Sequence, residues 1–138
     1  MSTELIGTWK LMSAVMEDVE SKVQTRAWGE HPNGCLILTS AGRWMVIQTA
    51  EGRKRAQDDA ERAAAFRSML AYSGKYRVDA DKIVIKVDIS ADEAWTGTEQ
   101  VRLFKLEGDK LHIEALPQPY PNFSGKVMRG ILTWVRES

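Results

Sequence analysis

The sequence predicts a single all-β domain: an antiparallel up-and-down β-barrel of about eight to ten strands, with one α-helix near residues 58–72. Three observations predict it. Short runs of strand-like residues are separated by turns rich in Gly, Pro, Asn and Asp. One stretch alone is alanine-rich, free of Gly and Pro, and periodic at about 3.6 residues. The strands follow one another as sequential hairpins, which favours a barrel over a sandwich.

Composition indicates one neutral, folded domain over residues 1–138. A chain of 138 residues can bury one substantial core but is too short for two. Lysine plus arginine equals aspartate plus glutamate, at 19 each. This balance argues against nucleic acid as a partner, because phosphate binding needs a basic surface.

Cysteine count and hydropathy bear on the compartment. Cys35 is the only cysteine, so an intramolecular disulfide is excluded and a reducing compartment fits. The N-terminal residues show no secretory pattern, and no apolar run is long enough to span a membrane. We therefore expect a cytoplasmic protein with no membrane partner.

The first strand begins in residues 5–11 and carries a Gly-x-Trp step. Gly7 allows the backbone to bend or to approach a neighbour closely. Side chains alternate along a strand, so two faces are expected. One face holds Trp9, Leu11, Ser13 and Val15, and the other holds Thr8, Lys10, Met12, Ala14 and Met16. Trp9 is expected to fill the interior.

A hairpin follows the first strand. After a polar turn and a weak strand at residues 23–28, a Gly/Pro/Asn cluster precedes the apolar run 35–39. Residues 40–42 form a tight turn into the run 43–49. Both runs are long enough for strands and too short for helices, which predicts a hairpin with a three-residue loop.

The helix is expected over residues 58–72. Asp58 and Glu61 resemble a capping box, and Gly74 lies where a glycine commonly ends a helix. An apolar face is formed by Ala63, Phe66, Met69 and Leu70. That face is expected to cover apolar surface at an open end of the barrel or against its wall.

Strand patterns then continue to the end of the chain. Further strands are expected at residues 75–78, 82–89, 98–107, 110–116 and 126–136. In the second of these, one β-branched face is formed by Ile83, Ile85, Val87 and Ile89. Gly108 and Asp109 suit a two-residue hairpin turn. The proline-rich segment 116–122 cannot be a central strand, because proline lacks an amide donor. The last strand is expected to pair with the first and close the barrel.

Five segments in order match a known pattern. They are residues 5–11, 34–45, 71–76, 95–102 and 132–136. On these segments the chain resembles the lipocalin-like domain family, a bacterial and fungal branch of the calycin barrels. The resemblance implies a lipocalin-like antiparallel barrel with an internal pocket for a small molecule.

The resemblance also implies roles for single residues. The Gly-x-Trp tryptophan, here Trp9, would lie at the closed end beneath an arginine of the last strand. Arg136 is the candidate, and a cation–π contact would make both residues structural. The family often has histidines in the strand that here reads Ile85-Lys86, so proton chemistry that depends on them is not expected.

Arg102 is the main candidate for contact with a ligand or substrate. It shares a strand face with Gln100 and Phe104. If that face points inward, a guanidinium lies in a cavity and needs acceptors or an anionic ligand. It would then recognise a carboxylate, enolate or carbonyl oxygen. The alternative is an arginine paired with an acidic residue across a strand, or one that faces solvent.

Aromatic residues supply further candidates for ligand contact. They are Trp28, Trp44, Tyr72, Tyr76 and Trp95, which could form large flat surfaces around a ligand. The alternative for each is ordinary core packing, because a barrel of this size holds either filler side chains or one small ligand.

Groups for acid–base or metal chemistry are sparse. His112 and Glu114 share a strand face and could act as acid and base, although a solvent-facing polar edge is the simpler interpretation. His31 lies in a turn, and the two histidines and one cysteine have no metal-binding spacing. No phosphate loop or nucleophile elbow is present.

Three functions remain open from the sequence. The first is binding of a small hydrophobic or aromatic metabolite, without a cofactor. The second is a cofactor-independent isomerase, cyclase or lyase acting on a small secondary-metabolite or aromatic-catabolism substrate, with Arg102 stabilising an oxyanion and Tyr76 or Glu114 carrying a proton. The third is an interaction module whose uncovered strands pair between subunits. A homodimer is compatible with all three.

Overall fold

The computed structural model describes residues 3–119 and 123–137. Its strands are β1 (Gly7–Asp18), β2 (Gln24–Thr25), β3 (Asn33–Leu38), β4 (Arg43–Thr49), β5 (Met69–Asp79), β6 (Lys82–Ser90), β7 (Glu99–Glu107), β8 (Lys110–Ala115), β9 (Gln118–Pro119) and β10 (Val127–Arg136). The helices are α1 (Asp59–Arg67) and two 3₁₀ turns, η1 (Thr3–Leu5) and η2 (Glu93–Trp95). Among these residues, no helix has both the length and the apolar character needed to cross a bilayer.

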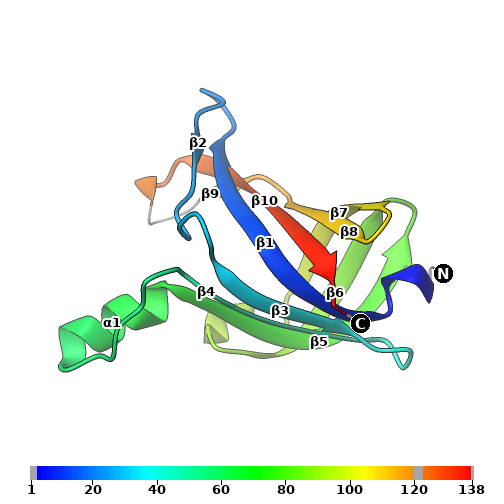
Figure 1. The fold of residues 1–138 in the computed structure, drawn as a ribbon, viewed down its shortest axis with the longest axis horizontal. Helices are drawn as coiled ribbons and strands as arrows, with labels where there is room; N and C mark the ends of the chain where they lie inside the picture. The colour runs from blue at the N-terminus through cyan, green and yellow to red at the C-terminus, as the bar shows by residue number, and fades with distance from the viewer. Residues whose placement is uncertain (1–2, 120–122, 138) are drawn as a thin grey trace.

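The described strands form a closed antiparallel barrel (Figure 1). Neighbours run in the order β1, β3, β4, β5, β6, β7, β8 and β10, and β10 returns to pair with β1 from Trp9↔Arg136 to Asp18↔Met128. The predicted up-and-down barrel and its closure by the last strand are therefore confirmed. Two short strands are added to this barrel: β2 pairs with β1, and β9 pairs with β10. The predicted proline-rich segment lies partly outside the described residues, which omit 120–122.

One end of the barrel is filled by Trp9, as the resemblance implied. Trp9 is fully buried, and its indole N–H donates to the carbonyl of Leu5 at 3.0 Å. The guanidinium carbon of Arg136 lies 4.3 Å from the centroid of the Trp9 ring. Arg136 also donates to the carbonyls of Glu4 and, at 2.9 Å, Ile6. This contact joins the start of the chain to its last strand.

A β-bulge changes which face of β1 points inward. The register of β1 against β10 shifts between Leu11 and Ser13. Trp9 and Leu11 are buried before the shift, whereas Ala14 and Met16 are buried after it. The prediction of a single face running from Trp9 through Ser13 and beyond is therefore wrong, because the bulge adds one residue and reverses the alternation.

A second irregularity lies between β5 and β6. The register skips Asp88 between the pairs Ser73↔Ile89 and Gly74↔Val87. Ile89 consequently leaves the face that it was predicted to share with Ile83, Ile85 and Val87, and it is 67% exposed. The side chain that turns inward is Ser90. Gly74 is essential to this approach of the two strands, since a Cβ there would lie 2.1 Å from the carbonyl oxygen of Lys86. Gly74 is thus a strand residue, and its predicted role in ending the helix is wrong.

Helix α1 is shorter than predicted and buries none of its residues. The predicted cap is present, because the Asp58 carboxylate accepts the amide of Glu61 at 2.8 Å. The helix ends at Arg67, because the chain from Met69 onward pairs with β4 instead. The predicted apolar helical face is accordingly split between α1 and β5. Phe66 remains about half exposed, and α1 projects from the end of the barrel (Figure 1).

Candidate ligand-binding site

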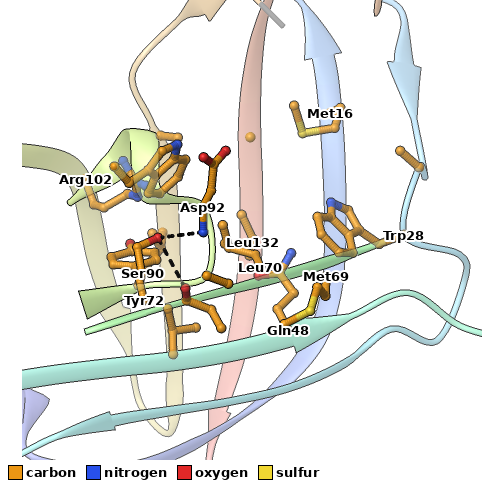
Figure 2. Close-up of a pocket in the computed structure, with 18 of the residues that line it drawn as sticks. Met16, Trp28, Gln48, Met69, Leu70, Tyr72, Ser90, Asp92, Arg102 and Leu132 are labelled. Atoms are coloured by element: carbon orange, nitrogen blue, oxygen red, sulfur yellow. Dashed lines mark hydrogen bonds between the residues drawn. The ribbon is translucent and has the colours of Figure 1, made fainter. Parts of the chain in front are cut away.

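The barrel encloses a cavity of about 700 Å³ (Figure 2). Most of its lining is apolar, and it draws on several strands because inward side chains recur at every second residue. β1 contributes Met16, and β10 contributes Gly130, Leu132 and Trp134. Phe66 of α1 also lines it, which places the helix at the cavity's edge. This volume falls within the range of pockets that hold a small organic ligand.

One wall of the cavity is aromatic. The rings of Trp44 and Tyr72 are stacked, with centroids 6.3 Å apart and planes at 26°. Tyr72 also meets Trp95 at 5.1 Å with the planes tilted by 57°. Trp95 is held there by η2, whose cap Asp92 accepts the amide of Ala94 at 3.0 Å. Three rings from β4, β5 and η2 thus form one continuous apolar surface.

Arg102 lies beside this aromatic wall. Its guanidinium carbon is 6.0 Å from the Tyr72 centroid and 5.9 Å from the Trp95 centroid, and it lines the cavity. Its Nη1 donates to the adjacent Val101 carbonyl at 3.1 Å. Within residues 3–119 and 123–137, no carboxylate forms an ion pair with Arg102. The side chain is therefore a cation on the cavity wall with donors left for a ligand oxygen.

Five of the predicted ligand-contact residues come together in the cavity lining. They are Trp28, Trp44, Tyr72, Trp95 and Arg102. Two others share the inward face of β7 but are not part of the lining. Gln100 donates to the Thr98 hydroxyl at 2.9 Å, and Phe104 packs against the core. Contact of any of these residues with a ligand stays a prediction.

The predicted proton carriers lie away from the lining. Tyr76 donates its hydroxyl to the Thr39 carbonyl at 3.2 Å, and burial raises the pKa of its phenol. Glu114 is bound at 3.0 Å by Nη1 of Arg129. His112, which shares the Glu114 face, contacts the Glu107 carboxylate at 2.7 Å. The described residues contain no group of three or more His, Cys, Asp or Glu side chains placed to hold a metal ion.

Several lining residues were not predicted. Gln48 lies on β4 in the same alternation as Trp44 and Val46, and Figure 2 shows it beside Met69 and Leu70. The alternation of β4 was the signal that could have identified Gln48. Met16 and Ser90 could not be found in that way, because each follows a bulge that reverses the inward face.

Outside the cavity, an ionic group links the closing strands. Arg129 of β10 contacts Glu17 of β1 and Glu114 of β8. Gln24 also donates to the Glu17 carboxylate at 3.2 Å. The hydrogen bond from Arg129 is the largest cause that lowers the pKa of Glu17, and Gln24 adds to it. Glu114 is therefore part of an ionic contact that joins β10 to its neighbours.

Comparison with known proteins finds a family model, a relative and a solved structure that are similar to this chain. A family model described as a lipocalin-like domain matches residues 6–137. Over 84 residues the chain is 33% identical to the 4'-hydroxy-3'-methoxypropiophenone carrier protein of Aspergillus oryzae. This aligned region covers 55% of this chain and 74% of that protein. The crystal structure of Echinococcus granulosus fatty-acid-binding protein 1 aligns with a TM-score of 0.44 at 14% identity, over 99% of this chain and 100% of that one.

Proposed function

The chain belongs to the lipocalin-like domain family, and we propose that its barrel binds a small aromatic metabolite and carries it chemically unchanged. The observation that carries the proposal is the cavity itself, where an aromatic wall meets a guanidinium without a carboxylate partner among the described residues. A ligand ring would contact Tyr72 and Trp95, and a ligand oxygen would accept from Arg102.

The relative from Aspergillus oryzae supports this ligand class. The name of that protein describes a carrier of 4'-hydroxy-3'-methoxypropiophenone. That name denotes one aromatic ring bearing a ketone, a hydroxyl and a methoxy group. We propose a ligand of the same class for this chain, because the ring suits the aromatic wall and the ketone or hydroxyl oxygen suits Arg102.

The first test is native mass spectrometry of the freshly purified protein, with the denatured mass measured alongside. A co-purified aromatic compound would support the proposal. The protein would then be titrated with 4'-hydroxy-3'-methoxypropiophenone, and tryptophan fluorescence followed, because Trp44, Trp95 and Trp134 line the cavity. Absence of saturable binding by this compound and by other aromatic ketones would contradict the proposal.

Arg102 gives the first mutational prediction. Arg102→Ala is expected to weaken binding of 4'-hydroxy-3'-methoxypropiophenone by about tenfold or more, since a hydrogen bond to a charged group contributes roughly 1.5–3 kcal/mol. The matched control is Arg77→Ala, which removes an exposed arginine paired with Glu99 at 3.3 Å. Equal affinities for the two variants would remove Arg102 from ligand recognition.

A carrier and an enzyme are separated by the fate of the ligand. Arg102 would stabilise an oxyanion if the cavity were that of an isomerase, cyclase or lyase. After hours with the protein, the recovered ligand is expected to have the chromatographic and NMR properties of the starting compound. A new product that fails to form with Arg102→Ala would favour the enzyme instead.

A further inference from the structure

We infer that the cavity contains a second recognition point that selects ligands with a hydroxyl group. It is centred on Gln48, and the indole N–H groups of Trp44 and Trp134 are two further unpartnered donors on residues that line the cavity. We call these three residues the inner polar group. The inference rests on the proposed function and narrows it from aromatic ligands in general to hydroxylated ones.

The inner polar group is buried and lacks partners. Gln48 is 3% exposed, and Trp44 and Trp134 are each 2% exposed. Oε1 of Gln48 and Nε1 of both tryptophans have no hydrogen-bond partner among the described residues. All three side chains line the cavity. Buried polar groups are rarely left without partners, so an unpartnered acceptor on a residue that lines the cavity points to a ligand that supplies a donor.

The strands on either side of Gln48 offer its side chain no polar side-chain partner. Its neighbours across the sheet are Gly34 on β3 and Leu70 on β5, neither of which has a polar side chain. Gly34 is also confined, because a Cβ there would lie 3.2 Å from a ring carbon of Trp134. The sheet therefore directs the amide of Gln48 into the cavity instead of across the strands (Figure 2).

The chemistry of these groups differs from that of Arg102. Arg102 and the two indoles can only donate hydrogen bonds, so any carbonyl, ether or carboxylate oxygen would satisfy them. Oε1 of Gln48 is an acceptor and needs a ligand donor. A hydroxyl meets this need, because it can donate to Gln48 Oε1 while its own oxygen remains free to accept a hydrogen bond. A hydrocarbon or a simple ketone leaves the Gln48 oxygen without a partner.

The test compares two ligands that differ by one hydroxyl, 4'-hydroxypropiophenone and propiophenone. Wild-type protein is expected to bind the hydroxylated compound about tenfold more tightly or better, because an unpaired buried polar group is costly. In Gln48→Met, which keeps the length of the side chain but removes the acceptor, the preference is expected to fall to about twofold or less. Because propiophenone lacks the hydroxyl, its affinity is expected to change less than that of 4'-hydroxypropiophenone.

Two further variants make the test specific. Gln48→Glu retains acceptor oxygens and is expected to keep the hydroxyl preference. If Gln48→Glu lost that preference, the inference would be overturned, even if Gln48→Met failed to fold. Asp92→Asn replaces a carboxylate that also lines the cavity with a neutral amide. If Asp92→Asn abolished the preference while Gln48→Met kept it, the recognition would belong to Asp92 and the inference would be wrong.

The inference and the proposed function fail in different ways. If wild-type protein bound both compounds equally, the inner polar group would have no selective role, while the carrier proposal would stand. If wild-type protein bound neither compound nor any related aromatic ketone, both would be rejected. If the preference persisted unchanged in Gln48→Met, the inference alone would be rejected.

Discussion

At the scale of single residues, Trp9 and Arg136 show how a short motif sets the closed end of the barrel. The indole is buried and donates to Leu5, while the guanidinium covers its face at 4.3 Å and donates to the carbonyl of Ile6 at 2.9 Å. A planar fork of donors suits these simultaneous contacts better than an ammonium does. The pair therefore holds the N-terminal turn η1 against the last strand.

Replacement of this arginine gives a stability prediction. Arg136→Lys keeps the charge but loses the planar donor geometry, and we expect it to lower the free energy of unfolding by about 1–2 kcal/mol. Urea denaturation followed by circular dichroism would measure the change. Arg77→Lys, at an exposed arginine, is the control and should shift the midpoint little. Equal midpoints for both variants would show that the contact with Trp9 contributes nothing specific.

At the scale of elements, the two register shifts decide what each strand presents to the cavity. The shift in β1 brings Met16 inward, and the one opposite Gly74 brings Ser90 inward and turns Ile89 out. Both are local insertions of one residue, and each reverses every later side chain on its strand. The composition of the cavity therefore depends on these two positions.

A substitution at Gly74 tests the importance of the register shift between β5 and β6. In Gly74→Ala the new Cβ would meet the Lys86 carbonyl oxygen at 2.1 Å, a backbone atom that can move only with β6. We expect a loss of at least about 2 kcal/mol in unfolding free energy, in line with other disruptions of buried backbone. Gly130→Ala in β10 is the matched control, since its added Cβ would have contacts no closer than 3.6 Å. A similar small loss in both variants would refute the tight approach at Gly74.

At the scale of the whole molecule, the barrel closes where β10 lies between β1 and β8. Here Arg129 contacts Glu17 on one side and Glu114 on the other. The hydrogen bond from Arg129 lowers the pKa of Glu17 below its ordinary value. A carboxylate whose pKa is lowered in the folded state adds stability above its unfolded pKa and loses it as the pH falls through the folded pKa.

The lowered pKa of Glu17 predicts how the melting temperature depends on pH. Between pH 7 and pH 3 the melting temperature of wild-type protein is expected to fall more than that of Glu17→Gln, which has no charge to lose at this position. Thermal melts followed by circular dichroism would measure both profiles. Glu99→Gln, at an exposed pair with Arg77, should keep the wild-type profile. Parallel profiles for wild-type and Glu17→Gln would contradict a role for Glu17 in acid stability.

The sequence by itself determined the strand order and the closure of the barrel. Turn residues such as Gly42 and Gly108 and the two-residue alternation act locally, so hairpins can be read from neighbouring residues. The placement of Trp44, Tyr72 and Arg102 on one cavity surface was also within reach of that alternation. The capped start of α1 at Asp58 was equally local.

Only the tertiary structure decided the end of the helix, the inward positions of Met16 and Ser90, and the surroundings of Gln48. The physical reason is that each depends on pairing with residues far along the chain. Residues 69–72 leave the helical pattern because β4 offers each of them a backbone partner, and β6 pairs with Tyr72 from the other side. The bulges arise where strands must bend to close the barrel, and no local periodicity shows where that bending takes place.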